Sequence, residues 1–282
     1  MSASPPTSLP HITLHGFPKS ANAPSLSGYC HKLETFLRAS GFTNYVHASS
    51  STTSSAPKKK LPYITLTTAS GVSTHSDSHF IVQHLLATGI VRDIDAEDAV
   101  LAPHQRADSR AYIAWTEELV YLAVVHTRWA RDHNFAVVAA GLPMPAMLRG
   151  VLAWWLRWNI TSALWTAGIG RHSDGEIEVL MKEYVDAVEA KLAWAEEQGA
   201  HWLLATRKPA LVDVVVWAFL ANALAENAGN REYAAMVLAR NPLRRYVERG
   251  CRLWFPEYED LLAAVEGGAE DGGALGEEGT GA

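Results

Sequence analysis

The stretch from Ser27 to Ser78 carries most of the information about the fold, in three short segments. Ser27-Gly28-Tyr29-Cys30 opens a run of apolar residues at helical spacing. Lys60-Leu61-Pro62-Tyr63-Ile64 places a proline just ahead of an alternating, strand-like pattern, and Ser76-Asp77-Ser78 opens a second helical pattern. Each segment alone is common, but their order and spacing predict two helix N-termini and one exposed backbone segment within a small α/β domain.

The apolar periodicity around these segments defines the expected elements. Strands are predicted at His11–Phe17, Tyr45–His47 and Tyr63–Thr67, helices at Tyr29–Ser40 and Ser78–Ala87, and a turn at Ser70-Gly71. This order of strand, helix, strand, strand and helix is thioredoxin-like. After Gly89 only helical patterns follow, at Pro103–His133, Ala146–Trp165, Asp174–Gln198, Leu211–Glu226, Arg231–Arg249 and Glu257–Glu266.

The sequence therefore predicts two domains and two flexible ends. A thioredoxin-like α/β domain is expected over residues 10–90 and an all-α domain over residues 100–264. Leu211–Glu226 is almost wholly apolar, so we expect it to be a buried central helix. Residues 1–9 are rich in Ser and Pro and residues 267–282 in Gly and Glu, which predicts a disordered arm and a disordered acidic tail.

Composition excludes several classes of protein. The 282 residues carry a formal net charge of −6, which favours neither nucleic acid nor an anionic membrane as a partner of the whole chain. Two cysteines, Cys30 and Cys251, argue against a disulfide scaffold and for a reducing compartment. No targeting signal is predicted, because the N-terminal residues form neither an apolar segment nor an Arg-rich amphipathic pattern. No membrane span is predicted, because Arg157 and Asp213 interrupt the most apolar runs. We expect a soluble, cytoplasmic protein.

Metal and hydrolase chemistry are not indicated either. The twelve histidines include two pairs at i,i+4 spacing, His11 with His15 and His75 with His79, but neither pair has a third ligand close in sequence. No Gly-x-Ser-x-Gly elbow and no glycine-rich phosphate loop occurs. Four of the ten tryptophans cluster at positions 154, 155, 158 and 165, where they are expected to fill core or an interface, or to meet a partner helix.

Each candidate site residue has a structural and a chemical interpretation. Ser27 can cap its helix, or its hydroxyl can stabilise a thiolate with help from the helix N-terminus. Cys30, most of a turn into the helix, is more typical of a buried residue than of a reactive one.

Pro62 can form a cis peptide bond that exposes the Leu61 backbone, or a trans bond that opens a strand. Asp77 and Ser78 can cap a helix or bind the charged end of a ligand. The lysines 58–60 can be a solvated loop or supply a cation for a carboxylate.

Together these features resemble the glutathione transferase fold, and more closely its branch of failed axon connections and metaxin-like proteins. The resemblance extends from about His11 to Tyr258 and is carried by six segments. They are Pro24–Glu34, Ala56–Ile64, Asp77–Ile81, Gly168–Ser173 and the run from Lys208 to Asp213 with Phe219–Asn222. Several positions depart from the family pattern, His15 and Ala210 among them. His15 occupies the neighbourhood in which some transferases carry a catalytic tyrosine, and Ala210 replaces the Ser or Thr that caps the central helix of the second domain.

The resemblance implies a glutathione site and a second substrate. Ser27 and Cys30 are the catalytic candidates, and Lys60, Leu61, Pro62, Asp77 and Ser78 are the candidates for binding glutathione as a co-substrate. Tyr112, Trp115, Tyr121 and Trp129 either line the groove for a small electrophile or are core aromatics. The resemblance further implies a homodimer.

Two functions remain open at this stage. One is a glutathione transferase that activates the glutathione thiolate. The other is a non-catalytic, metaxin-like binding or scaffold protein, with a protein partner and association with the mitochondrial surface.

Overall fold

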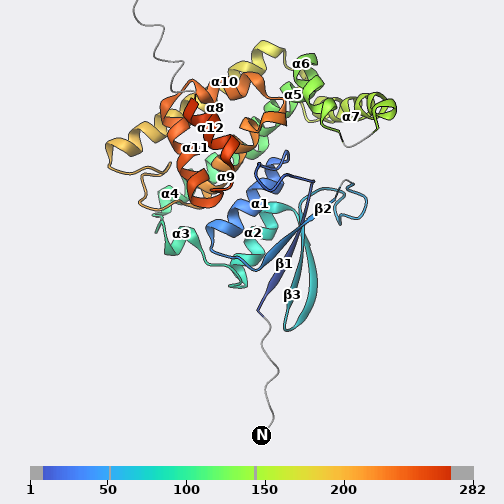
Figure 1. Cartoon of the computed structure of the whole chain (residues 1–282). Helices are drawn as coiled ribbons and strands as arrows, with labels where there is room; N and C mark the ends of the chain where they lie inside the picture. The colour runs from blue at the N-terminus through green and yellow to red at the C-terminus, as the bar shows by residue number, and fades with distance from the viewer. Residues whose placement is uncertain (1–8, 51, 143–144, 268–282) are drawn as a thin grey trace, which may run out of the picture.

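The computed structural model describes residues 9–50, 52–142 and 145–267, and combines a four-stranded mixed sheet with a larger helical region (Figure 1). The sheet has the order β2-β1-β3-β4. β1 (His11–Gly16) pairs in parallel with β2 (Tyr45–Ser49) and antiparallel with β3 (Tyr63–Thr68), which pairs antiparallel with β4 (Gly71–Ser76). The predicted fold class is confirmed. The predicted arm and tail lie, apart from Leu9 and Gly267, outside the described residues.

The prediction of three strands was wrong, because it missed β4. In β4, Val72 is the only apolar side chain, and most of the strand is exposed at the edge of the sheet. Such a strand is held by its backbone ladder with β3 and leaves no alternation of apolar and polar residues to detect. The remaining strands and the two helices of this region start and end within two residues of the predicted positions.

One face of the sheet is covered by α1 (Gly28–Ala39) and α2 (Ser78–Ala87). Every second residue of β1 is buried, and Ile12 and Leu14 lie in one core cluster with Leu33 and Phe36 of α1 and Ile81 of α2. Two helix N-termini are thereby set against the same sheet.

Among the residues that the structure describes, the helical region begins with a short α3 (Ile94–Glu97) and continues through nine longer helices. They are α4 (Pro103–Ala114), α5 (Tyr121–Ala130), α6 (Asp132–Ala140), α7 (Ala146–Thr166), α8 (Asp174–Glu197), α9 (Leu211–Leu224), α10 (Arg231–Leu238), α11 (Asn241–Trp254) and α12 (Glu259–Gly267). Two single turns of 3-10 helix, η2 (Ile169–Arg171) and η3 (Glu226–Ala228), and the π-helical segment η1 (Trp115–Val120), complete it.

Two predicted helices are each divided in the structure. The predicted helix Pro103–His133 passes through η1 and ends at Ala130, because Arg131 has an extended backbone with ψ 128°. The predicted helix Arg231–Arg249 is interrupted at Arg240, whose φ of −114° and ψ of 113° are also extended. Pro242 lies in the first turn of the second piece, where its missing N–H costs no helical hydrogen bond. At each break a single residue has an extended backbone. Apolar periodicity does not detect such a residue, because the apolar pattern continues on both sides of it.

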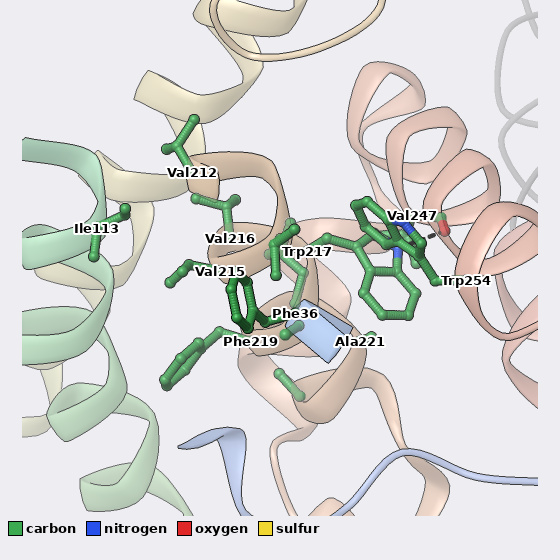
Figure 2. Packing of buried hydrophobic residues seen from close by; sticks show 14 of the residues in the cluster. Phe36, Ile113, Val212, Val215, Val216, Trp217, Phe219, Ala221, Val247 and Trp254 are labelled. Carbon is green, nitrogen blue, oxygen red and sulfur yellow. Dashed lines mark hydrogen bonds between the residues drawn. The ribbon is translucent and has the colours of Figure 1, made fainter. Parts of the chain in front are cut away.

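α9 is the buried centre of the helical region, as predicted. All residues from Val212 to Leu224 are buried, and the Trp217 indole donates a 2.8 Å hydrogen bond to the Val247 carbonyl of α11 (Figure 2). Although Ala210 cannot cap this helix with a side chain, Asp213 accepts hydrogen bonds from the backbone N–H groups of Ala210 and Leu203, each 2.9 Å long. Complete burial raises the pKa of Asp213 to about 7.

α1 is the main bridge between the sheet and the helical region, because its other side packs along α9. The fully buried His31 of α1 hydrogen bonds through Nδ1 to the carbonyl oxygen of Ala218, 2.9 Å away. The ammonium of Lys32 forms a buried ion pair, 2.5 Å long, with Glu117 of η1. Within the described ranges, no helix is long and apolar enough to cross a membrane.

Candidate functional site

The sheet register brings the segments at Ser27, Lys60 and Ser76 to one edge of the sheet, the edge at which β1 and β4 end and β3 begins. His15 of β1 lies opposite Tyr63 of β3, and Tyr63 lies opposite Ser76 of β4. Because neighbouring strands are about 4.8 Å apart, the residues just beyond these positions are neighbours in space. Gly16, which leads into the loop before Ser27, therefore lies near Pro62, and Pro62 lies near Asp77.

The first component of this site is the N-terminus of α1. Ser27 has an extended backbone, its side-chain oxygen accepts a 3.4 Å hydrogen bond from the Cys30 N–H, and its own N–H donates to Ser25 Oγ at 3.2 Å. Capping by Ser27 is thus confirmed, whereas its action on a thiolate stays a prediction. The side chain is 8% exposed, so its hydroxyl lies at the margin of the protein interior.

Cys30 lies behind Ser27 and is buried, as its position in the helix predicts. Its side chain packs in a small cluster with Ala56 and Leu61. Burial raises the pKa of the Cys30 thiol, against the opposing effect of hydrogen bonds from the Ser27 side chain and the Phe17 backbone. The thiol is therefore held in its protonated form, which is the less nucleophilic one.

The second component is the segment before β3. The Leu61–Pro62 peptide bond is cis, which confirms that alternative, and both residues are buried. Among the described residues, neither the N–H nor the C=O of Leu61 forms a hydrogen bond. A backbone donor and acceptor are therefore available at this edge, the requirement for pairing with an extended peptide.

The third component is the N-terminus of α2. Asp77 has a positive φ of 77°, a conformation that costs a residue with a side chain roughly 1–3 kcal/mol. Its carboxylate accepts a 3.1 Å hydrogen bond from the His79 N–H and lies 3.5 Å from the Lys58 ammonium. Ser78 is the first residue of the helix and is 5% exposed. The lysine that faces the carboxylate is thus Lys58, while Lys60 is exposed.

Comparison with known proteins agrees with this geometry. Residues 28–134 match the family described as "Glutathione S-transferase N-terminal domain". Among solved structures, FzlA from C. crescentus has a TM-score of 0.57 and 15% sequence identity, over 90% of this chain and 92% of that one. Glutathione transferase F2 from Populus trichocarpa has a TM-score of 0.51 and 10% identity, over 91% of this chain and 99% of that one. The chain has the glutathione transferase fold. The family match covers residues 28–134 and the solved structures show the fold, while the predicted branch of failed axon connections and metaxin-like proteins is not confirmed.

The four aromatic candidates for the groove lie in different surroundings within the glutathione transferase fold. Tyr121 packs edge-on against Tyr29 of α1 and Phe219 of α9, with ring centroids 4.8 and 5.3 Å away. Trp115 packs against Tyr184 of α8, Tyr112 lies beside Trp115, and Trp129 packs against Phe135 of α6. Of the four, Tyr121 is the one whose ring contacts the first turn of α1.

A hollow of about 220 Å³ does lie between the sheet-covering helices and the helical region. It is bordered by α1, α2, α4 and α9, and the Lys32–Glu117 ion pair belongs to its wall. None of the four predicted groove aromatics is among its lining residues.

Sequence reasoning missed the residues that hold the loop before α1. The Arg128 guanidinium of α5 donates to the Leu26 carbonyl at 2.9 Å, and the Asn222 amide of α9 donates to the Ser25 carbonyl at 2.5 Å. Arg128 and Asn222 are themselves hydrogen bonded, 3.4 Å apart. Arg128 is buried, and no Asp or Glu among the described residues pairs with it. The available signal was a lone arginine within the otherwise mostly apolar run Tyr121–Ala130.

The described histidines near the sheet do not form a metal site. In the part of the chain that the structure describes, no three His, Cys, Asp or Glu side chains are placed to hold a metal ion. His15 stacks on Tyr63 with ring centroids 4.1 Å apart and hydrogen bonds to Thr65, while His75 stacks on His84. These histidines have structural partners within the sheet and α2.

Proposed function

We propose that this glutathione transferase-like protein binds glutathione at the sheet edge formed by Ser27, Leu61 and Ser78, and activates its thiol for attack on a small electrophile. One observation carries the proposal: the two helix N-termini and the Leu61 backbone, which makes no hydrogen bond among the described residues, converge at a single edge of the sheet. Glutathione is an anionic peptide with a backbone to pair, carboxylates to bind and a thiol to ionise. Its chemistry therefore matches each of the three components.

The proposed roles follow from the chemistry of each component. The N–H groups of the first turn of α1 and the Ser27 hydroxyl would hold the glutathione sulfur as a thiolate. The nearby buried charge of Arg128, which lacks an acidic partner among the described residues, favours an anion at this position. Leu61 would pair with the cysteinyl backbone. In the reaction the thiol proton leaves to solvent, the sulfur forms a bond to an electrophilic carbon of the acceptor, and the acceptor takes up the electron pair or expels its leaving group.

The two ends of glutathione have separate candidate partners. The Ser78 hydroxyl and the N–H groups that begin α2 suit the γ-glutamyl carboxylate, and the Asp77 carboxylate suits the γ-glutamyl ammonium. Lys58 lies 3.5 Å from Asp77, so glutathione must share or displace this ion pair. Because the Lys58 side chain is 54% exposed, that exchange costs little free energy. Lys60 is free to approach the glycyl carboxylate.

The second candidate function is a non-catalytic binding or scaffold role, as in the metaxin-like proteins of the resemblance. It is favoured by the small exposure of Ser27 and by the hydrogen bonds that its side chain already makes with Cys30. A site used only for structure would keep these bonds. A homodimer and a cytoplasmic location, with association with the mitochondrial surface, are proposals shared by both functions.

Calorimetric titration of glutathione separates the two functions. We expect wild type to bind glutathione and to show a rise in thiolate absorbance, and Ser27→Ala to lose that rise. S-methylglutathione, whose sulfur carries no proton to lose, should bind both proteins alike. Ser20→Ala is the matched control, because Ser20 is an exposed serine in the same loop. If millimolar glutathione gives neither heat nor thermal stabilisation of wild type, the catalytic proposal is wrong and the scaffold role stands.

A further inference from the structure

The outward face of α7 carries a row of exposed apolar side chains that the proposed glutathione site does not use. Seven large apolar side chains lie on it and are between 52% and 94% exposed. They are Met147, Leu148, Val151, Trp154, Trp155, Trp158 and Trp165. α7 lies at the periphery of the helical region, beyond α5 and α6 (Figure 1). The expectation that these tryptophans fill the core is therefore wrong, and an external partner remains.

The exposed residues form one continuous face. Leu148, Val151, Trp155, Trp158 and Trp165 recur at spacings of three, four or seven residues, which places them along one side of a helix. Ala153 and Leu164 of the opposite side are buried against the protein. From Met147 to Trp165 the face is about 27 Å long at 1.5 Å per residue. Contiguous apolar surfaces of this size usually mark an interaction site.

The charge around this face differs from that of the whole chain. Residues 133–173 contain no Asp or Glu, although the protein has 30 acidic residues and a net charge of −6. The same segment carries Arg149, Arg157 and Arg171. The Arg171 guanidinium lies 5.8 Å from the centre of the Trp165 ring, whereas Arg157, in the middle of α7, pairs with Asp132 of α6. The apolar face therefore has no acidic residue in its own segment and has a cation, Arg171, at its C-terminal end, within an acidic protein.

We propose that the outward face of α7 binds the surface of an anionic lipid bilayer, with the helix lying in the plane of the interface. Tryptophan is enriched at the boundary between hydrocarbon and headgroups, because its ring is apolar and its N–H can still meet water. Helices with an aromatic apolar face, cationic flanks and no acidic residues bind there through buried area and attraction to anionic lipids.

The C-terminal end of the face offers polar groups at the depth of the headgroups. A hollow of about 480 Å³ opens there, lined by His126, Ala130, Thr161, Ser162, Trp165, Thr166 and Gly170. His126 is 7% exposed, and its Nδ1 atom has no hydrogen-bond partner among the described residues. Hydroxyl groups, an unpaired imidazole nitrogen and an indole ring together suit a phosphate-bearing headgroup.

Co-sedimentation of the full chain with vesicles tests the proposal. We expect wild type to bind phosphatidylcholine vesicles that contain phosphatidylserine, with weaker binding to pure phosphatidylcholine and at high salt. Tryptophan emission should shift to the blue on binding. Trp154→Ser combined with Trp158→Ser should lower the partition coefficient roughly tenfold or more, because two large apolar side chains are lost from the interface.

The matched control is Trp194→Ser, which makes the same substitution at an exposed tryptophan of α8, 43% exposed and outside the face. It should bind vesicles like wild type, and all variants should keep the circular dichroism and the glutathione binding of wild type. Equal vesicle binding by the double variant and wild type overturns the proposal, as does no binding of wild type to anionic vesicles. Oligomers that dissociate in the double variant, without vesicle binding by wild type, would assign the face to a second copy and also overturn it.

Discussion

Arg128 and Leu26 are joined by a 2.9 Å hydrogen bond that crosses 102 residues of sequence, from a helix of the helical region to the loop that ends at Ser27. Asn222 makes the equivalent bond to Ser25. The N-terminus of α1 is therefore positioned by the helical region as well as by the sheet. The sheet and the helical region therefore both help to hold the candidate site at Ser27 in place.

Replacement of Arg128 by Met should destabilise the protein and loosen this loop. The Leu26 carbonyl would lose a charged donor in a buried setting, which costs about 2–4 kcal/mol of the free energy of unfolding. Urea denaturation measures the cost, and Arg207→Met, at an exposed arginine, should change it by less than about 0.5 kcal/mol. Arg128→Lys keeps one donor and should lie between the two. Equal stability of Arg128→Met and wild type would contradict the role given to this hydrogen bond.

Gly28→Ala should weaken the packing between α1 and α9. A Cβ atom at Gly28 would lie 2.7 Å from the ring of Phe219, which projects from α9 (Figure 2). Overpacking of this kind costs about 1–3 kcal/mol, and thermal unfolding reports it. Gly175→Ala is the matched control, because Gly175 also lies in a first helical turn but has nothing within 4 Å of its added Cβ. It should raise stability by roughly 0.5–1 kcal/mol. A neutral Gly28→Ala variant would show that the two helices separate without cost.

Stability should fall in mild acid because of His31. Burial lowers the pKa of the His31 imidazole from 6.5 to about 4, so the folded protein holds it neutral while the unfolded chain takes up a proton near pH 6.5. The contribution is complete above pH 6.5 and is lost as the pH falls toward 4, by up to about 3 kcal/mol. Urea denaturation at several pH values measures the slope.

The control for this slope is His31→Asn, which cannot titrate but keeps a donor near the Ala218 carbonyl. Its stability should depend less on pH between 6.5 and 5 than that of wild type, whatever its absolute value. His201→Asn, at an exposed histidine, should leave the slope unchanged. Identical slopes for wild type and His31→Asn would mean that His31 is protonated without loss of the fold.

The buried pair of Lys32 and Glu117 should be expensive to break from one side. Lys32→Met leaves the Glu117 carboxylate without its cation in a buried site, which costs about 3–5 kcal/mol. Lys32→Met combined with Glu117→Leu removes both charges and should recover most of that loss. A double-mutant cycle from denaturation curves measures the coupling. Additive losses of stability in the double variant would contradict the expected coupling between Lys32 and Glu117.

How far the sequence predicts this structure depends on whether the signal is local. The caps at Ser27 and Asp77 and the proline at position 62 were visible, because capping and proline geometry are decided by neighbouring residues. β4 was not, because an exposed polar edge strand depends on its partner. The contacts of Arg128 and Asn222 join segments that only the tertiary fold brings together. Lys58, rather than Lys60, faces Asp77 because of the turn in which Lys59 has a φ of 54°.

The anchoring of Ser25 by Asn222 has a consequence for protein synthesis. Strands β1 to β4 leave the ribosome early, yet the loop beside Ser27 receives its last tether from a residue synthesised 197 positions later. Until α9 has emerged, the sheet of the nascent chain is present but the loop before α1 lacks its hydrogen bond from Asn222. Fragments truncated before α9 lack the same hydrogen bond between Asn222 and Ser25. Any assay of ligand affinity on such a fragment would measure a loop in its untethered form.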